Sequence, residues 1–413
     1  MTGNTKCCDI PITVITSELR KQTAGTPRLE RLIEYMLTRG FPVEVINTGY
    51  LWSTQIHQFN SIDDFYIYKK IYLSASTQYK NGSRVGCWND VLRKCKHFLF
   101  IDMLSPAIII LLVKFLIKKK TCKNILASSP SFGNVFSAYF LKCLHPNTFF
   151  WCDMRDEWAM HKYIFFHKKL RKYIEKKVFE KSNLLTVASA ASKNNIDKAY
   201  GINKAVLLYN VSTKQENSNN ESMSFYFESD VINLLYLGTM PDGYYNDELF
   251  ISFVDMIKDR TYRGKRFTIH FVGFSGKLSN VLSNKKYSNL VIFHPAISHS
   301  QALLVMKKAD VLLFFGVDWA NNGGIVPAKL LEYITSGTPI LPFSIKNSSD
   351  VDFIFKKTCK KSLYINNLDD LMSFLNMNAY LEQLPCKQDE LFINELIVNQ
   401  QNVLELFLQN VTN

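Results

Sequence analysis

Long apolar runs and C-x-x-C pairs are the features that this sequence lacks most clearly. The longest apolar run, residues 107–117, is interrupted by Lys114 and falls well short of the roughly 20 residues of a membrane-spanning helix. The nine cysteines include no C-x-x-C pair, which argues against a zinc site or a disulfide framework. The N-terminus lacks a basic region followed by an apolar core, so we expect no secretory signal. Together these absences predict a protein of the reducing cytoplasm.

The positive charge of the chain is concentrated in one region. The 413 residues are 47% apolar, which indicates a folded protein of two or three domains. The net charge is +13, and residues 84–181 alone hold 19 lysines and arginines against 7 aspartates and glutamates. Such a region suits a polyanion or an anionic membrane surface. Nucleic-acid binding is the weaker alternative, because the lysine blocks are not interleaved with aromatic residues on an open platform.

Residues 161–181 carry much of this charge in a helical pattern. Apolar residues such as Ile164, Leu170 and Val178 recur at helical spacing between blocks of lysine. A basic amphipathic helix of this kind can lie on an anionic membrane. A plain surface helix with a solvated lysine face is the alternative.

The most informative stretch lies in residues 311–341. Residues 311–315 form an unbroken apolar run, typical of a parallel strand buried on both faces. Gly323 and Gly324 then allow the backbone to come close to a ligand. Pro327 suits the first turn of a helix, and Gly337 suits its end. The pattern predicts a strand, a glycine loop and a helix, after which residues 338–341 begin a new strand.

A helix that follows a glycine loop is a candidate anion site. Its free N–H groups and its dipole both favour a diphosphate. Lys329 and Glu332 are three residues apart on this helix and share a face. A carboxylate at that position suits the two hydroxyl groups of a ribose. An ordinary βαβ unit in which the glycines only form a loop has the same local pattern.

The first part of the chain predicts a second unit of the same kind. Strands are predicted over residues 10–15 and 41–46, with a helix over residues 27–37 between them. Arg28 on this helix is expected either to face a cleft or to be solvated. Residues 47–100 show no pattern that we can assign, and an apolar helix is predicted after Pro106.

Two further strands of this part end in polar residues. They are predicted at residues 125–128 and 149–152, and Asp153, Arg155 and Asp156 follow the second. Charged groups at the carboxyl end of a sheet strand lie where open α/β sheets bind ligands. A local Arg–Asp salt bridge that orders the loop is the alternative.

Two motifs in these regions resemble those of a known family. The segment VPAKLLEYITSGTPIL, residues 326–341, is similar to the P-x-K-L-x-E-Y-x-x-x-G-x-P-I signature of the family 4 glycosyltransferases of the GT-B fold. The segments ASSP, residues 127–130, and DMRDEW, residues 153–158, resemble a subset of the same family. The resemblance implies two Rossmann-like, doubly wound α/β domains that face each other across a cleft.

The resemblance also implies a domain order and a reaction. Residues 1–208 would form the acceptor-side domain, 209–230 a linker, 231–385 the nucleotide-sugar domain, and 386–413 a helix that returns to the first domain. The reaction would be transfer of a sugar, with retention of configuration, from a UDP- or GDP-linked donor to a lipid-linked saccharide acceptor. The place would be the cytoplasmic face of a bacterial cell membrane, in the biosynthesis of lipopolysaccharide or capsule, with residues 161–181 on the anionic surface.

The resemblance finally implies a set of site residues. The donor is a substrate, so no cofactor is expected, and the one Asp-x-Asp, residues 350–352, lies away from the donor loop, so no metal is expected either. Gly324 stands where the family often has a glutamate, and residues 241–245 lack the basic residue that many members carry after Gly238. An inactive scaffold of the same fold is therefore an alternative, and an epimerase is a weaker one. The expected catalytic residues are Asp153, Arg155 and Asp156, and the expected donor-binding residues are Gly238, Thr239, Ala296, Ile297, Gly323, Gly324, Ile325, Val326, Lys329 and Glu332.

Overall fold

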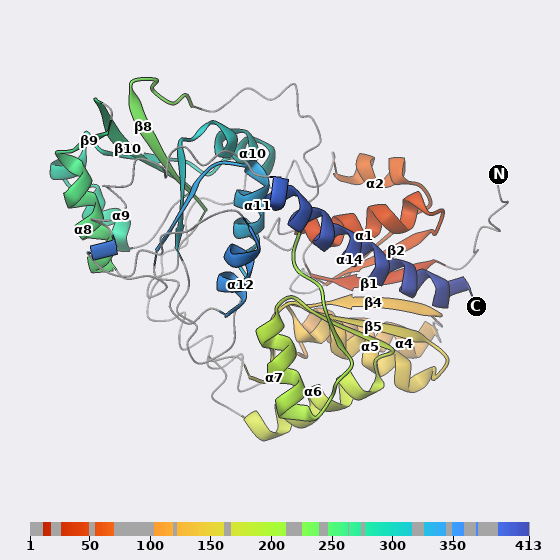
Figure 1. The fold of residues 1–413 in the computed structure, drawn as a ribbon. Helices are drawn as coiled ribbons and strands as arrows, with labels where there is room; N and C mark the ends of the chain where they lie inside the picture. The colour runs from red at the N-terminus through yellow and green to blue at the C-terminus, as the bar shows by residue number, and fades with distance from the viewer. Residues whose placement is uncertain are drawn as a thin grey trace. The chain divides into compact units, whose positions relative to one another are not determined.

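The computed structural model of the chain contains two compact units. The first comprises residues 1–210 and 398–413, and the second comprises residues 211–397. Each has its own sheet and its own core (Figure 1). The structure describes residues 11–17, 26–48, 54–69, 103–118, 122–160, 167–211, 225–238, 247–262, 264–273, 277–315, 326–343, 349–358, 369–370 and 387–412.

The first unit is built on a seven-stranded sheet in the order β3-β2-β1-β4-β5-β6-β7. All neighbouring strands are parallel except β3, which runs antiparallel to β2. The central strands β1 and β4 are buried along their whole length, and in β5 only Phe149 is partly exposed, as expected for parallel strands covered by helices. The strands are β1 (Ile12–Thr16), β2 (Val43–Asn47), β3 (Gln55–Phe59), β4 (Asn124–Ser128), β5 (Phe149–Met154), β6 (Leu184–Val187) and β7 (Ala205–Leu207).

Helices cover both faces of this sheet (Figure 1). One core cluster joins the sheet to α1, α2 and the end of α14, and a second joins it to α4, α5, α6 and α7. None of the helices in the described ranges is both long and apolar enough to cross a membrane. The helices are α1 (Thr26–Thr38), α2 (Ile62–Tyr68), α4 (Pro106–Lys118), α5 (Phe132–Leu144), α6 (Lys168–Lys181), α7 (Ala190–Tyr200) and α14 (Lys387–Thr412).

The second unit repeats the same architecture with a smaller sheet. The parallel order is β11-β10-β8-β12-β13, and the short β9 pairs antiparallel with β10. Phenylalanines of α8 and of the strands dominate the core on one face. The strands are β8 (Val231–Leu237), β9 (Thr261–Tyr262), β10 (Lys265–Val272), β11 (Val291–His294), β12 (Val311–Phe315) and β13 (Ile340–Phe343).

Helices α8 and α9 lie on one face of this second sheet, and α10, α11 and α12 lie on the other (Figure 1). Gly337 follows α11 in the left-handed conformation, at φ 77°, as the sequence predicts. Pro327 lies one position earlier than predicted: its ψ of 129° is extended, so it precedes the helix. The helices are α8 (Asp247–Lys258), α9 (Lys277–Leu282), a 3₁₀ turn (Lys285–Tyr287), α10 (His299–Lys308), α11 (Ala328–Ser336) and α12 (Ser349–Lys357).

Candidate functional site

In the second unit, the turn after β8 is held in place from α11. The backbone N–H of Leu237 donates to the hydroxyl of Tyr333 at 3.1 Å, and its carbonyl accepts from the ammonium of Lys329 at 3.1 Å. Gly238 follows with φ 92°, a conformation that residues with a side chain rarely adopt. Two residues of α11, Lys329 and Tyr333, therefore contact the carboxyl end of the central strand β8. Open α/β sheets bind ligands at such strand ends.

Lys329 is the cation of this turn. Its ammonium donates to the hydroxyl of Tyr236 at 2.7 Å and lies 4.4 Å from the centre of that ring. A Cβ atom placed on Gly238 would lie 3.6 Å from the same nitrogen. Burial lowers the pKa of Lys329 to about 8, and the nearby Glu332 opposes this shift. A glycine turn and a partly desolvated ammonium therefore adjoin each other.

Glu332 lies one helical turn beyond Lys329, and its side chain is 14% exposed. Its carboxylate is 3.7 Å from the imidazole of His299, the first residue of α10. Burial raises the pKa of Glu332, while His299 and Lys329 favour its charged form. The sequence analysis missed His299 and Tyr236, because neither pairing can be read from helix or strand periodicity.

The loop after β11 approaches the end of β10. Gly273 has φ 67°, and a Cβ atom placed there would lie 3.4 Å from Ala296. The N–H of Gly273 donates to the carbonyl of His294 at 3.1 Å, and the N–H of Gly238 donates to Val272 at 2.8 Å. The carboxyl ends of β8, β10 and β11 are thus linked by backbone contacts, with Ala296 and Ile297 following β11.

The predicted donor loop is described only from its last residue onward. Val326 is described and is buried at 5% exposure. The predicted residues Thr239, Gly323, Gly324 and Ile325 lie outside the described residues. The structure therefore brings together Gly238, Lys329 and Glu332 of the predicted set.

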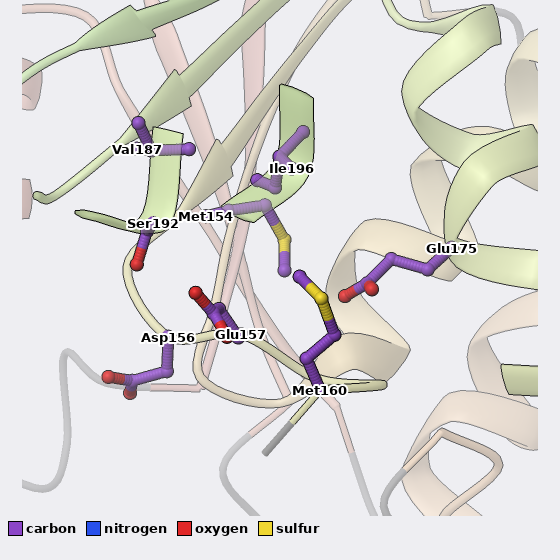
Figure 2. A pocket seen from close by; sticks show the side chains of 8 residues that line it. All are labelled: Met154, Asp156, Glu157, Met160, Glu175, Val187, Ser192 and Ile196. Atoms are coloured by element: carbon purple, nitrogen blue, oxygen red, sulfur yellow. The ribbon is translucent and has the colours of Figure 1, made fainter. Parts of the chain in front are cut away.

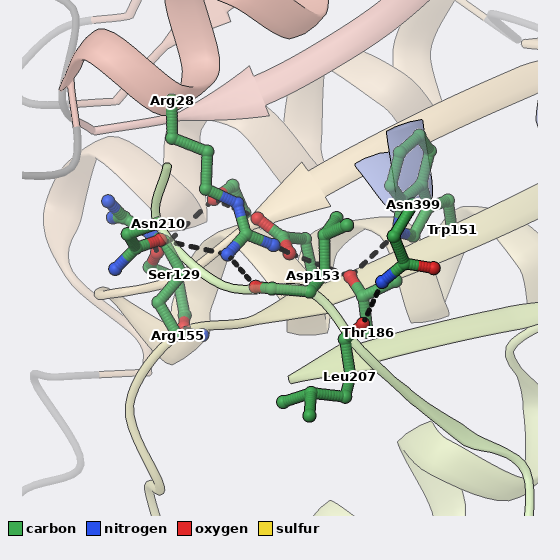
Figure 3. Close-up of polar contacts among 11 residues, drawn as sticks. Arg28, Ser129, Trp151, Asp153, Arg155, Thr186, Leu207, Asn210 and Asn399 are labelled. Carbon is green, nitrogen blue, oxygen red and sulfur yellow. Dashed lines mark hydrogen bonds and ion pairs between the residues drawn. The ribbon is translucent and has the colours of Figure 1, made fainter. Parts of the chain in front are cut away.

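In the first unit, Asp153 at the end of β5 is the centre of a buried polar network (Figure 3). It forms an ion pair with Arg28 and accepts hydrogen bonds from Ser128 at 2.9 Å and Thr186 at 2.7 Å. Asp153 is 1% exposed and Arg28 is 2% exposed. The expectation of a solvated Arg28 was wrong, because a carboxylate from a distant strand completes its environment.

Arg28 also reaches the segment that follows β7. Its guanidinium donates to the carbonyl of Leu208 at 2.6 Å and to the side chain of Asn210 at 2.8 Å. The contact joins α1, β5 and the end of the first unit's main segment (Figure 3). Asp153 therefore supports the surrounding loops and has almost no surface of its own to offer a ligand.

Arg155 and Asp156 differ in how far they are enclosed. The backbone N–H of Arg155 donates to the hydroxyl of Ser129 at 2.9 Å, and its guanidinium donates to the Ser129 carbonyl. Arg155 is 9% exposed, whereas Asp156 is only partly buried. Asp156 lines a narrow pocket, too small to hold a water molecule, together with Glu157, Glu175 and Ser192 (Figure 2). Two methionines, Met154 and Met160, complete its apolar side.

The pocket holds carboxyl groups that the sequence did not single out. Glu157 accepts from Asn195 at 2.9 Å, and burial raises its pKa. Within the described ranges, no group of three or more histidine, cysteine, aspartate or glutamate side chains has a geometry that could hold a metal ion. The Asp-x-Asp segment lies in the first turn of α12, where Asp350 is buried and Asp352 pairs with Lys356 at 2.6 Å.

Comparison with known proteins gives matches in structure only. No protein-family model matches the chain, and no curated protein matches it in sequence. A sucrose-phosphate synthase from Thermosynechococcus elongatus is 13% identical, with 98% of this chain and 99% of that chain covered and a TM-score of 0.58. The lipopolysaccharide outer core galactosyltransferase WaaB, in its apo form, is 14% identical, with 98% of both chains covered and a TM-score of 0.52.

Two more structures complete the comparison. An E. coli structure described as trehalose-6-phosphate bound with UDP-2-fluoro glucose is 10% identical, covers 97% of this chain and 98% of that chain, and has a TM-score of 0.54. The chain spans only 57% of the length of TarM, with 72% of this chain covered, 17% identity and a TM-score of 0.50. These matches confirm the predicted fold class: the chain has the GT-B fold, with two Rossmann-like domains.

Proposed function

We propose that the protein is a retaining glycosyltransferase that moves a sugar from a nucleotide-sugar to a saccharide acceptor. The observation that carries the proposal is the placement of Lys329 against the Gly238 turn, with Glu332 one turn further along the same helix. Proteins of the same fold, including WaaB and the structure bound with UDP-2-fluoro glucose, support it by analogy.

The ammonium of Lys329 suits the diphosphate of the donor. Many relatives of this type carry a basic residue after the glycine that ends the first strand of the domain, and this chain has none in residues 241–245. Lys329 reaches the same turn from α11, through the carbonyl of Leu237. A fixed cation and backbone N–H groups would stabilise the charge that develops on a departing diphosphate.

Glu332 suits the ribose of the donor. Its carboxylate is largely enclosed, and such a group accepts hydrogen bonds strongly from two adjacent hydroxyls. Ala296 and Ile297, after β11, are proposed to contact the base. The donor is proposed to be UDP- or GDP-linked, and the loop of residues 323–326 is proposed to supply further backbone donors.

On the acceptor side, we assign direct contact to Asp156 and the support of its loop to Asp153 and Arg155. The assignment follows burial, because Asp153 is enclosed by Arg28, Ser128 and Thr186. Carboxylates at the carboxyl end of β5 are suited to bind sugar hydroxyls.

The acceptor is proposed to be lipid-linked, in cell-surface polysaccharide biosynthesis, with the protein bound reversibly to an anionic membrane. Helix α6 presents lysines together with exposed Leu170 and Tyr173. Helix α4 offers a stronger apolar surface than the sequence indicated. We call the exposed side chains Ile109, Val113, Leu116 and Ile117, which are 46–76% exposed, the apolar row.

The proposal is tested by thermal shift with UDP, GDP and their sugar conjugates. A rise in melting temperature with one nucleotide diphosphate, followed by release of that diphosphate from its sugar conjugate, is the expected result. Binding of none of them supports the second candidate, an inactive scaffold, which Gly324 favours because many relatives have a glutamate there.

A further inference from the structure

The loop that carries Asp156 is fastened by a carboxyl group from another element. We call residues 155–160 the site loop. The backbone N–H groups of Trp158 and Ala159 both donate to one oxygen of Glu175, at 3.1 and 3.4 Å. Glu175 lies on α6 and is 1% exposed. Buried backbone N–H groups need hydrogen-bond acceptors, which a helix or strand supplies from its own backbone. In this loop the Glu175 carboxylate is the acceptor instead.

The second oxygen of Glu175 is also engaged. It accepts a hydrogen bond from the hydroxyl of Tyr200, at the end of α7. Burying a carboxyl group is unfavourable unless donors surround it, and here three donors do so. Glu175 thereby connects α6, α7 and the site loop at one point, on the wall of the pocket that Asp156 lines (Figure 2).

The indole of Trp158 fixes the loop on its other side. Its ring stacks on Phe132 with centroids 3.9 Å apart and planes 2° apart. The guanidinium of Arg171, fully buried on α6, lies 4.7 Å from the same indole. Glu157 is tied to α7 through Asn195. The site loop is thus held from α5, α6 and α7, and Glu175 makes the contacts to the backbone of Trp158 and Ala159.

We propose that Glu175 is the positioning residue of the acceptor side, holding the site loop so that Asp156 and Glu157 keep their places in the pocket. The assignment of this loop to the acceptor side rests on the proposed function. The anchoring of the loop by Glu175 does not. Glu175 acts through the loop and is not assigned any contact with a substrate.

This arrangement makes the loop respond to pH in a distinctive way. Burial raises the pKa of Glu175 to about 7, and its hydrogen-bond donors oppose the shift. Because the folded pKa is above that of the unfolded chain, its contribution to stability is complete below pH 4.5 and is lost as pH rises through about 7. The two loop N–H groups bond the ionised carboxyl more strongly than the neutral one, so the surroundings of Trp158 should change as Glu175 titrates. The charged or titratable groups around it are Cys152, Asp156, Glu157, Arg171 and Tyr200.

The environment of Trp158 should therefore follow the protonation of Glu175 across neutral pH. In protein labelled with 5-fluorotryptophan, the resonance of Trp158 is identified by its loss in Trp158→Phe. We expect it to titrate with a midpoint near pH 7 in the wild type and to be flat in Glu175→Gln, whose amide keeps the shape. Glu180→Gln, on the exposed face of the same helix, is the matched control and should titrate like the wild type.

Amide exchange supplies the second measurement. At pH 8, Glu175→Ala should raise exchange at Trp158 and Ala159 at least tenfold while β5 and β6 stay protected, and Glu175→Gln should restore much of the protection. An unchanged Trp158 titration in Glu175→Gln would overturn the proposal, and this result remains decisive if Glu175→Ala does not fold. Exchange that rises equally across the whole unit in Glu175→Ala also overturns it.

A donor measurement separates this inference from the proposed function. UDP and GDP affinity should be the same in wild type and Glu175→Gln, because the donor residues lie in the other unit. In the wild type, the rate of UDP release from UDP-glucose, or of GDP release from GDP-mannose, should show an inflection near pH 7. The same pH profile in Glu175→Gln should lack this inflection. No binding of either nucleotide, with an intact Trp158 titration, would count against the proposed function alone. An inflection retained in Glu175→Gln would count against the role of Glu175.

Discussion

Arg28 and Asp153, which are 125 residues apart in the chain, form an ion pair that is almost closed off from solvent. The pair joins the first helix of the unit to its fourth parallel strand and, through Leu208 and Asn210, to the segment after β7. Two charges buried in this way are stable only as a pair, because each would otherwise be a desolvated charge without a partner.

Replacing one member of this pair should therefore lower the free energy of unfolding far more than a substitution at the surface does. We expect Asp153→Asn to lower the free energy of unfolding of the first unit by about 3–5 kcal/mol. Urea denaturation monitored by tryptophan fluorescence measures this free energy. Asp156→Asn makes the same chemical change at a partly exposed position and should cost little. In the double variant Arg28→Met, Asp153→Asn, a loss equal to the sum of the single losses would show that the two side chains do not interact.

Glu332→Gln should weaken donor binding without unfolding the protein. A hydrogen bond to a charged group contributes about 1.5–3 kcal/mol, so the dissociation constant of the bound nucleotide diphosphate should rise at least about tenfold. Calorimetric titration measures it. Glu248→Gln, on the exposed start of α8, is the matched control in the same unit. A well-folded Glu332→Gln protein with wild-type affinity would falsify the ribose assignment.

Donor affinity should also fall at alkaline pH because of Lys329. Its pKa in the free protein is lowered to about 8, whereas a lysine in water titrates near 10.5. A diphosphate prefers the charged ammonium, so affinity should be highest below pH 8 and decline as pH rises through 8 to 9. Lys329→Met should bind more weakly at pH 7 and show no such decline. If the decline persists in Lys329→Met, another group is responsible.

Membrane binding should depend on both the apolar row and the lysines of α6. Burying one large aliphatic side chain contributes about 1.5–3 kcal/mol, so Leu116→Ser with Ile117→Ser should reduce binding to anionic vesicles at least about tenfold. Ile67→Ser, at an apolar position of α2 that is 58% exposed, is the control.

The salt dependence of membrane binding distinguishes the contribution of the lysines from that of the apolar row. Each lysine near an anionic surface contributes about 1 kcal/mol, and salt screens this attraction. Reversing the charge at Lys168, Lys169, Lys172 and Lys176 should release the protein at moderate salt. Co-sedimentation with vesicles measures both effects, and equal binding to neutral and anionic vesicles would contradict the electrostatic part.

The elements that the sequence predicted well are those whose signal is local. The parallel strands predicted at residues 10–15, 41–46, 125–128, 149–152, 311–315 and 338–341 appear within two residues of those places, because a strand buried on both faces must be largely apolar. The strand β3 and the helix α2 were missed. The sequence of β3, QIHQF, lies at the edge of the sheet and is only half buried, so it lacks that signal.

Side-chain partners were the part that could not be predicted. Arg171 and Glu175 read as two more charges on a basic helix, yet both are buried beneath the site loop. Leu170 and Val178 were grouped as apolar residues of this helix, yet Leu170 is 48% exposed and Val178 is buried. Lys329 was found by motif, but its contact with Tyr236 comes from a strand about 90 residues earlier. Such pairings depend on the tertiary fold, which periodicity does not report.

The way the chain returns to its first unit has a consequence for its synthesis. Residues 398–413 belong to that unit, and Phe407 packs against Trp151 of its central sheet, with ring centroids 5.1 Å apart. The ribosome releases these residues only after the whole second unit has been made. Domains usually fold as they emerge, N-terminal first. Here the second unit can complete its core earlier, while the first must wait with an uncovered patch around Trp151, a state in which chaperones or misassembly can intervene.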